Sequence, residues 1–464
     1  MTDRDTVDYL GLTRELCAFA AGVVADDNER LFARLQQELP FTLTRVPSGS
    51  EHNGWVVPDN WRVERARLTR DGAVVFDGTA HTLGVARYST SFTGTLDWRE
   101  LEPHLVTNAD LPDAYMFHCM WQYRPWAADW ALSVPHRIYR DLGPGAYQVE
   151  LVTTRTPGDM ILAEYEHRGR SARTIVFNTN TCHPHQANDG FAAVAMMVRL
   201  FQWIRTQDTY YTYRLLLAPE HLGSVFYLKD RSRADLERMV CGIFAEMPGT
   251  ASGIRSAGTF LGRQPLDAAI ENALRHHARA HQIAAWRCGA GNDETVWEAP
   301  GYEVPFIEAT RSEREGQHYR EYHSSADDPD LMDQGQIHEF CVVLQKTVET
   351  LERNARLYRT FDGLICLSNP KYDLYLERWD PTVDKPIDET AERWGHLLDS
   401  LFRYFDGSMT ILDIATKHDL PFDRLWQYLR RFEAKGLIEM RFEPVERVPI
   451  SRPLGARHVP ADDH

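Results

Sequence analysis

Cysteine is scarce in this sequence, and no two cysteines stand in CxxC spacing. The seven cysteines are scattered and odd in number, so they predict neither a disulfide framework nor a thiolate zinc knuckle. No apolar run approaches the roughly 20 residues that a helix needs to span a bilayer. The N-terminal stretch, MTDRDTVDYL, also lacks the apolar core of a signal peptide. These absences predict a soluble cytoplasmic protein with reduced cysteines.

Basic side chains are in short supply as well. The chain has 51 lysines and arginines against 67 aspartates and glutamates, which gives a formal net charge of -16. This balance argues against broad attraction to nucleic acid or to an anionic membrane, because both are polyanions. With 464 residues, of which 43% are apolar, the chain is long enough for about three domains with sizeable cores.

The pattern of apolar and turn-forming residues changes along the chain, and these changes predict its domains. Apolar residues three and four positions apart between Thr6 and Glu38 predict one or two amphipathic helices. Short β-type pieces among Gly, Asp and Pro turns follow, and from Met160 to Asp362 strand and helix patterns alternate. We therefore predict an α/β core with helices on both faces of a sheet, formed by residues 1–44 and 156–362. An inserted, mostly β domain is expected at 45–155.

Six strands and four helices are expected in the core from Met160 onward. The strands are 160–165, 174–180, 213–218, 241–245, 282–287 and 304–309, and the helices are 191–204, 223–229, 266–280 and 332–351. After a linker at 363–387, three helix patterns and a hairpin pattern predict a winged helix at 388–448, followed by a tail at 449–464. The segment 115–126, YMFHCMWQYRPW, is unusually aromatic; a core stripe is favoured, and a wall of the substrate pocket is the alternative.

The stretch from Thr174 to Gly190, TIVFNTNTCHPHQANDG, is the one around which we expect the chain to be organised. It begins as a buried-type strand and opens into His183 and Asp189. Strands of open α/β sheets carry ligands at their carboxyl edge, so imidazole and carboxylate at this point indicate a metal site. The alternative is a turn in which residues 188–190 cap the next helix.

Three later segments place further ligand-type side chains at comparable points. Glu220 and His221 follow the next strand, Glu246 ends the one after it, and His323 lies in a later loop. Taken singly, each is more often a solvated acid or a satisfied histidine. Their convergence on one edge of a single parallel sheet favours a common metal centre.

Motifs along nearly the whole chain resemble those of one known family, in the same order. They are Cys182-His183-Pro184 with Asn188-Asp189, Tyr213-Arg214 leading to Pro219-Glu220 and Gly223-Ser224, Asn292-Asp293-Glu294, residues 322–327 (YHSSAD), residues 48–51 (SGSE) and residues 55–61 (WVVPDNW). With them the chain resembles the co-catalytic zinc aminopeptidases, and more closely a group of bacterial aminopeptidase-like proteins with an inserted β-rich domain and a C-terminal winged helix. The resemblance implies an aminopeptidase-like (phosphorylase/hydrolase-like) mixed sheet.

The resemblance also implies zinc as the cofactor, in two ions, and a role for each motif residue. His183 would bind one ion, Asp189 would bridge both, and His323 would bind the other. Glu220 would be the general base that deprotonates the attacking water. His221 stands where the aminopeptidases have a metal-binding Glu, and Glu246 where they have an Asp. Both are ligand types here, whereas in the closer group these positions often are not.

Four residues around these ligands are expected to support the site or to contact the substrate. We expect Asp327 to orient His323 and Asn188 to shape its loop. His185 either replaces a carboxylate behind the metal ligand or is an exposed loop residue, and the exposed residue is favoured. Asp293 is a candidate either for this supporting shell or for contact with substrate.

Substrate contacts are expected in the loop before His323. Arg311, Tyr319 and Tyr322 could bind a carboxylate or an acyl group, and a charged surface loop is the alternative. Free-amine specificity needs a carboxylate that faces the substrate amino group. Glu294 or Glu308 could serve, and the spacing selects neither.

The function predicted is zinc-dependent hydrolysis of an amide, as an aminopeptidase or as an N-deacylase. The substrate would be a small peptide or an N-acylated small molecule. Two alternatives stay open: a ligand-sensing or DNA-binding regulator with an inactive hydrolase-like core, and a related enzyme of acyl transfer or cyclisation. Basic residues in the candidate recognition helix, 421–435, are balanced by Asp423 and Glu433, so packing or homo-oligomer formation is favoured over DNA binding.

Overall fold

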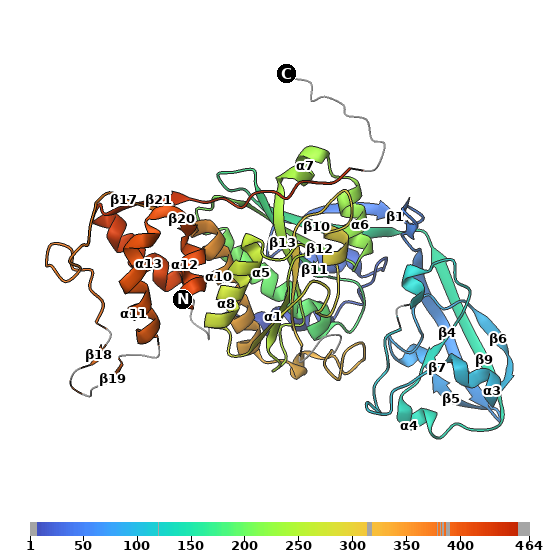
Figure 1. Cartoon of the computed structure of the whole chain (residues 1–464). Helices are drawn as coiled ribbons and strands as arrows, with labels where there is room; N and C mark the ends of the chain where they lie inside the picture. Colours follow the sequence, from blue (N-terminus) through green and yellow to red (C-terminus); the bar gives the residue numbers. More distant parts are fainter. Residues whose placement is uncertain are drawn as a thin grey trace, which may run out of the picture.

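The computed structural model describes residues 7–118, 120–312, 318–377, 379–380, 382, 385–386 and 390–452. Figure 1 shows an elongated molecule with a large sheet and its helices at the centre. A smaller β-rich region lies at one end, and the C-terminal helices lie at the other. The candidate site residues belong to the central part.

The central sheet has eight strands and mixed direction. Its order is β1 (Thr42–Pro47), β10 (Asp159–His167), β12 (Thr212–Ala218), β11 (Thr174–Asn180), β13 (Met239–Glu246), β16 (Phe306–Arg311), β14 (Ile254–Ala257) and β15 (His281–Ala284). The middle four strands, β12, β11, β13 and β16, run parallel, whereas β10 and β14 run antiparallel to their inner neighbours. Every residue of these four strands is buried, which explains their nearly unbroken apolar sequences.

Helices cover both faces of this sheet, as the alternating strand and helix patterns predicted. On one face, α1 (Tyr9–Cys17), α2 (Asn28–Leu35), α5 (Ala192–Ile204), α8 (Pro265–His277) and α10 (Gln334–Arg353) share an apolar core with Ile175 and Phe177 of β11. On the other, α6 (Leu222–Lys229), α7 (Arg233–Arg238) and α9 (Glu294–Trp297) pack with Val176 of the same strand. Successive side chains of a strand point to opposite faces, so one buried strand supplies both cores. The predicted α/β class is confirmed.

A second, four-stranded antiparallel sheet forms what we call the β-rich region, residues 60–156. Its order is β5 (Ala73–Asp77), β4 (Asn60–Arg70), β9 (Ala146–Thr156) and β6 (Phe92–Asp97). Tyr147, Val149 and Leu151 alternate along β9 and are buried in a core that is separate from the two cores of the central sheet. Shorter elements complete it: α3 (Trp98–Leu101), α4 (His136–Tyr139), β7 (Leu105–Val106) and β8 (Leu132–Ser133). Just before it lies the small hairpin of β2 (Glu51–His52) and β3 (Trp55–Val56).

The C-terminal block differs from its prediction in one respect. The helices α11 (Ala391–Ser400), α12 (Ile411–His418) and α13 (Phe422–Ala434) are formed where helix patterns were expected. The hairpin expected after them is wrong, because β21 (Ile438–Phe442) pairs with β17 (Ala355–Arg359), and β20 (Asp406–Thr410) covers the other side of β17. A local pattern cannot reveal a partner so far back in the chain. The winged helix itself stays a prediction.

Other boundaries shift by a few residues. The strand expected at 282–287 ends at Ala284, and β14, antiparallel to β16, was not foreseen. Two-residue strands, β18 (Trp379–Asp380) and β19 (Lys385–Pro386), lie within the expected linker, part of which falls outside the described residues. The same holds for residues 453–464 of the expected tail.

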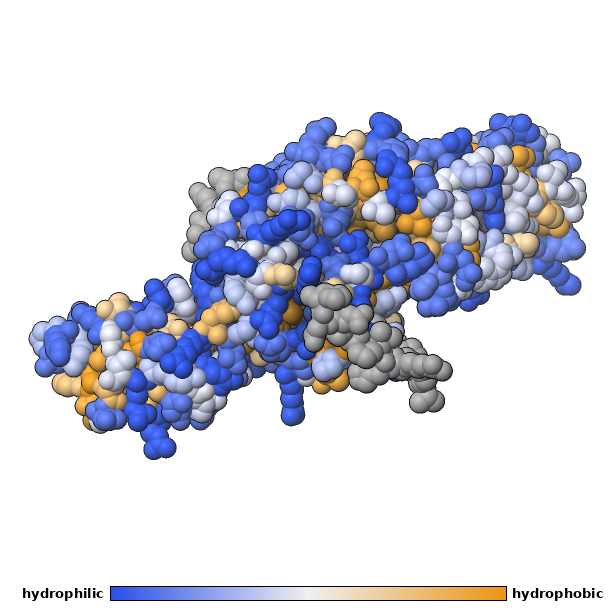
Figure 2. All heavy atoms as spheres, turned by 90° about the horizontal axis from the view of Figure 1, so that it is seen from above, coloured by the Kyte–Doolittle hydropathy of each residue, from blue (hydrophilic) through white to orange (hydrophobic). Residues whose placement is uncertain are grey.

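On the face of the molecule that Figure 2 presents, hydrophilic residues interrupt the patches of apolar ones. No helix in the part of the chain that the structure describes combines the length and the apolar character needed to cross a bilayer.

Close packing between β13 and β16 gives a test of the central sheet. Gly242 faces Phe306 on the neighbouring strand, and a Cβ atom there would overlap the Phe306 ring, which is itself stacked on Trp297 with centroids 4.7 Å apart. We expect Gly242→Ala to lower the free energy of unfolding by about 1–3 kcal/mol, because this buried ring has no room to move. Urea denaturation followed by circular dichroism measures the loss.

Gly143→Ala is the matched control, since nothing lies within 4 Å of the added atom there. Equal stability of the two variants would contradict the packing described for β13 and β16.

Candidate metal centre

Four strand exits meet at one edge of the central sheet. Because β11, β12, β13 and β16 run parallel, the segments that follow them leave the sheet on the same side. His183 and Asp189 follow β11, Glu220 and His221 follow β12, and Glu246 ends β13. His323 arrives from the long loop between β16 and α10.

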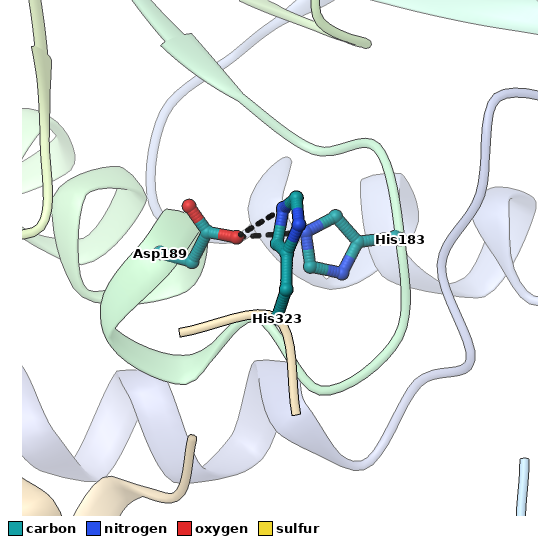
Figure 3. A group of neighbouring side chains, drawn as sticks. All are labelled: His183, Asp189 and His323. Carbon is teal, nitrogen blue, oxygen red and sulfur yellow. Dashed lines mark hydrogen bonds and ion pairs between the residues drawn. The ribbon is translucent and has the colours of Figure 1, made fainter. Parts of the chain in front are cut away.

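His183, Asp189 and His323 form a compact group at this edge. Their potential ligand atoms all lie within 4.8 Å of one another. The Asp189 Oδ2 atom is 2.8 Å from His183 Nε2 and 3.5 Å from His323 Nε2, and Figure 3 shows both imidazoles directed at this oxygen. The side chains of His183 and Asp189 are only 3% and 8% exposed, whereas His323 is 24% exposed.

Hydrogen bonding within this group fits a cation. The Nδ1 atom of His183 lies 2.9 Å from the carbonyl oxygen of Pro184, which can only accept, so Nδ1 carries the proton. In the neutral ring Nε2 then presents a lone pair to the carboxylate oxygen of Asp189. A contact of 2.8 Å between this nitrogen and a carboxylate oxygen needs a positive charge, supplied either by a second proton on the ring or by a cation beside the two atoms. Zinc bound by imidazole nitrogen and carboxylate oxygen meets that need.

The protonation states of these groups also suit metal ligands. Burial would raise the pKa of Asp189, but the His183 hydrogen bond and the nearby histidines outweigh it and lower this pKa, which keeps the carboxylate ionised. Burial lowers the pKa of His323 to about 4, so its ring is neutral at physiological pH. A carboxylate and neutral imidazoles are the forms that bind zinc.

Unusual backbone conformations surround this group. Asp189 lies in a π-helical turn, Ala187–Phe191, directly before α5, so it does not cap that helix as the alternative interpretation required. His185, His221, Met247 and His323 have φ values of 54°, 52°, 49° and 54°. Non-glycine residues in this region each cost on the order of 1–3 kcal/mol, and such strain, like π-turns, concentrates at functional sites.

Asp327 supports the turn that carries Asp189, which corrects our prediction for it. Its carboxylate accepts hydrogen bonds from the backbone N–H groups of Asn188 and Asp189, at 2.9 and 3.2 Å. We had expected it to orient His323 instead. Burial raises the pKa of Asp327 to about 7, with the charge of Asp189 as the second cause. Asn188 Oδ1 accepts from Gly249 N at 2.8 Å and ties this loop to the one after β13.

His221 lies outside the three-residue group. Its Nδ1 is 3.0 Å from Asp293 Oδ1, which also accepts from its backbone N–H at 2.6 Å. The other ring nitrogen, Nε2, lies 3.4 Å from Glu220 Oε1. Burial disfavours the charged ring, but the Asp293 hydrogen bond and charge raise the pKa of His221 to about 9. In this conformation the residue that we predicted as a metal ligand is an imidazolium bound to Asp293, which also accepts a hydrogen bond from Ser224.

Glu220 lies on the partly exposed side of the site, as does His323. A quarter of its side chain is exposed (25%), in contrast with the buried ligands. Partial burial raises the pKa of Glu220 to about 7, opposed by His221 and aided by the charges of Asp293 and Asp189. A carboxylate with this pKa can take up and release a proton near neutral pH.

Glu246 is fully buried beside the group and only half satisfied. Its Oε2 accepts from Asn292 Nδ2 at 2.9 Å. Among the described residues, its Oε1 has no hydrogen-bond partner. Burial, with Asp189 and other carboxylates nearby, raises the pKa of Glu246. A buried carboxylate oxygen without a donor is unfavourable, and a cation would satisfy it.

Three predicted substrate contacts serve the protein's own framework instead. Arg311 is buried and donates to the backbone carbonyls of Pro248, Ser252 and Gln336, so it is neither a substrate ligand nor a surface residue. Glu294 binds Arg287 and the N–H of Asn292. Glu308 accepts from the N–H groups of Ala290 and Gly291. The bonds of Glu294 and Glu308 hold the loop at 287–292 in place.

Aromatic rings enclose the histidines. Tyr322 stacks on His323 with centroids 3.8 Å apart, and Phe117 stacks on His183 at 4.1 Å. Tyr319 is a buried neighbour whose pKa is raised by burial and by the charges of Asp327 and Asp189. The sequence marked residues 115–126 as aromatic but gave no sign that Phe117 meets His183, since the two are far apart in the chain.

His185 is the last residue whose position differs from expectation. It is half-buried rather than exposed, and its ring lies 4.5 Å from that of His81, which stacks on Tyr115. It therefore contacts the β-rich region through His81.

Comparisons with known proteins agree with this architecture. The family described as "Domain of unknown function (DUF4910)" matches residues 11–354. A Clostridium acetobutylicum protein named "Putative polysaccharide biosynthesis protein with aminopeptidase-like domain" is 26% identical over 428 residues, which cover 90% of this chain and 93% of that protein.

Solved structures share the fold. A "putative peptidase" from Clostridium acetobutylicum superposes with a TM-score of 0.76 at 23% identity, over 93% of this chain and 96% of the other. BSAP, a zinc aminopeptidase from Bacillus subtilis, gives a TM-score of 0.54 at 11% identity, over 73% of this chain and 92% of the other. The chain therefore has an aminopeptidase-like fold.

The support that Asp327 gives to Asp189 can be tested through metal binding. We expect Asp327→Ala to weaken zinc binding about 10- to 100-fold, because the Asp189 turn loses two hydrogen bonds that set its position. Titration against a chromophoric chelator measures the change. Asp330→Ala removes a carboxylate that is 85% exposed three residues further on, and it should bind zinc like the wild type. Equal affinities for both variants would show that the turn holds its shape without Asp327.

Proposed function

This chain belongs to the family described as Domain of unknown function DUF4910, and on that premise we propose that it is a zinc-dependent hydrolase that cleaves an amide bond. One observation carries the proposal: His183 and His323 both direct a ring nitrogen at the same carboxylate oxygen of Asp189. An oxygen of Glu246 that has no hydrogen-bond partner among the described residues is buried nearby. The fold shared with zinc aminopeptidases supports the same chemistry without specifying a substrate.

Each residue has a proposed part in the reaction. Zinc held at this group would polarise the amide carbonyl and lower the pKa of an attacking water from about 16 to about 7. Glu220, at the open side, takes a proton from that water and delivers it to the nitrogen of the leaving amine. The C–N bond breaks, and the products are a carboxylic acid and an amine. His221 Nε2, 3.4 Å from Glu220 Oε1, favours the ionised form of this carboxylate, which burial opposes.

We propose two zinc ions that share Asp189. Glu246 would join one of them through its unpartnered oxygen. His221 would have to leave Asp293 before it could join the other. The second ion should therefore bind more weakly than the first.

The substrate we propose is a short peptide with a free N-terminus or an N-acylated small molecule. Two aromatic rings lie near His221, the neighbour of the general base: the ring centroids of Trp55 and Tyr123 are 6.0 and 6.2 Å from that of His221. The name of the Clostridium acetobutylicum relative mentions polysaccharide biosynthesis. Aminoacyl anilides and N-acetylated amino sugars are therefore the two substrate panels to assay.

A regulatory role through DNA gains no support from α13. Arg430 pairs with Glu433 on the same helix, and Arg431 donates to the carbonyl of Asp373. Asp423 binds Lys346 of α10 at 2.9 Å. These three charges are used within the chain, which favours the packing role.

The general base can be tested by one isosteric change. We expect Glu220→Gln to reduce turnover of a cleaved amide by about 10²- to 10⁴-fold, because the amide cannot accept the proton of the attacking water. Zinc content, measured by atomic emission, should stay at the wild-type value. Glu64→Gln, at an exposed position of β4, is the control and should be fully active. Undiminished activity of the Glu220 variant would refute this assignment.

A substitution of His221 tests whether this residue binds a metal ion or only Asp293. If it turns toward a second ion, His221→Ala should keep the tighter zinc and lose most of the weaker one, as seen by calorimetric titration. His167→Ala, on β10 and half-buried, is the control for loss of an imidazole. Two-ion binding that is unchanged in His221→Ala would leave this residue with Asp293 and Glu220 alone.

A further inference from the structure

A three-residue segment of the β-rich region, Tyr115–Phe117, lies against the loop that carries His323. The two segments are paired through their backbones like antiparallel strands, with a bridge between Met116 and Ser324. Phe117 N–H donates to the carbonyl of His323 at 2.7 Å, and Ser325 N–H donates to the carbonyl of Tyr115 at 2.8 Å. Tyr115 N–H in turn donates to Ser325 Oγ, 210 positions along the chain, at 3.0 Å.

This segment is anchored within its own region as well. Met116 N–H donates to the hydroxyl of Ser133, at 2.6 Å, and Ser133 is fully buried in β8. The loop of His323, by contrast, belongs to no helix or strand of the central sheet. Asp327 ties the end of this loop to the Asp189 turn, and the backbone of residues 323–325 pairs with the β-rich region.

The Phe117 ring completes the contact. It is 7% exposed and stacks on His183, with centroids 4.1 Å apart and planes inclined by 16°. It meets His323 edge-on, at 5.1 Å and 85°. The metal-binding lone pairs of an imidazole lie in the plane of its ring. A phenyl group on the face of His183 fixes the tilt of this ring and leaves its Nε2 free to bind.

His323 needs such support because its backbone is strained. Its φ of 54° lies in the left-handed region, where a non-glycine residue persists only if its surroundings hold it there. The hydrogen bond from Phe117 N–H ends on the carbonyl of this same residue. Loss of the pairing would free both the backbone and the ring of His323.

We propose that Phe117 is a positioning residue for the metal centre, so that the β-rich region completes the zinc site by docking Tyr115–Phe117 on the His323 loop. The inference rests on the proposed zinc-dependent function. It adds that zinc binding and docking of this segment stabilise each other, because a ligand that binds only the docked arrangement shifts the equilibrium toward it.

Zinc affinity is the first measurement. We expect Phe117→Ala to bind zinc about 10- to 100-fold more weakly than the wild type in competition with a chromophoric chelator, the range seen when groups that orient a metal ligand are removed. Phe117→Tyr keeps the flat ring and should restore most of the affinity. Phe92→Ala, which removes a stacked, half-buried ring on β6 of the same region, should leave zinc affinity unchanged.

Hydrogen exchange of the wild-type protein is the second measurement. Zinc should slow exchange of the Phe117 and Ser325 amides at least tenfold relative to the apo protein, because these amides bridge the two segments. If Phe117→Ala does not fold, Ser325→Ala takes its place. It removes only the acceptor of the Tyr115 N–H, and we expect it to weaken zinc binding several-fold.

The outcomes separate the two proposals. A wild-type protein that binds no zinc would overturn the proposed function and this inference with it. Tight zinc binding by the wild type and by Phe117→Ala alike, or by Ser325→Ala in its place, would overturn the positioning role and leave the hydrolase proposal standing. Equal protection of the Phe117 amide with and without zinc would overturn the linkage between docking and metal binding.

Discussion

The carboxylate of Asp189 is the constraint on which the rest of the site depends. It is ionised, almost wholly buried and faced by the Nε2 atoms of two imidazoles. A buried negative charge requires compensation, which a cation held by these three side chains would supply. The surrounding structure is arranged accordingly: Asp327 holds the Asp189 turn through its backbone, and Phe117 and Tyr322 fix the planes of the two rings.

Parallel strands explain why these groups meet. In β11, β12 and β13 every side chain is buried, and the one arginine among them, Arg214, pairs with Glu166 and Asp235. The ionisable groups of the candidate site appear where the strands end. The loops that follow then need sharp changes of direction. Left-handed residues at His185, His221 and Met247 and a π-turn around Asp189 provide them. The strain is offset by the large apolar cores on both faces of the sheet.

The β-rich region also contributes to the position of the His323 loop. Its own sheet and core are separate from the central ones, yet its segment Tyr115–Phe117 pairs with the His323 loop. His81 and His185 extend the same contact. On the proposal that Phe117 positions the zinc ligands, the centre would form only when both regions are in place, and metal binding would be coupled to their arrangement.

The sequence by itself determined the α/β class, the buried strands and the side chains that leave them, because strand periodicity and residue type are local properties. It foresaw His183, Asp189 and His323 as one group. Tertiary structure alone decided that His221 binds Asp293, that Asp327 supports Asp189, that Arg311 is an internal brace, and that β21 pairs with β17. Each of these depends on a partner distant in the chain, and spacing along a sequence carries no information about which distant groups will share a hydrogen bond.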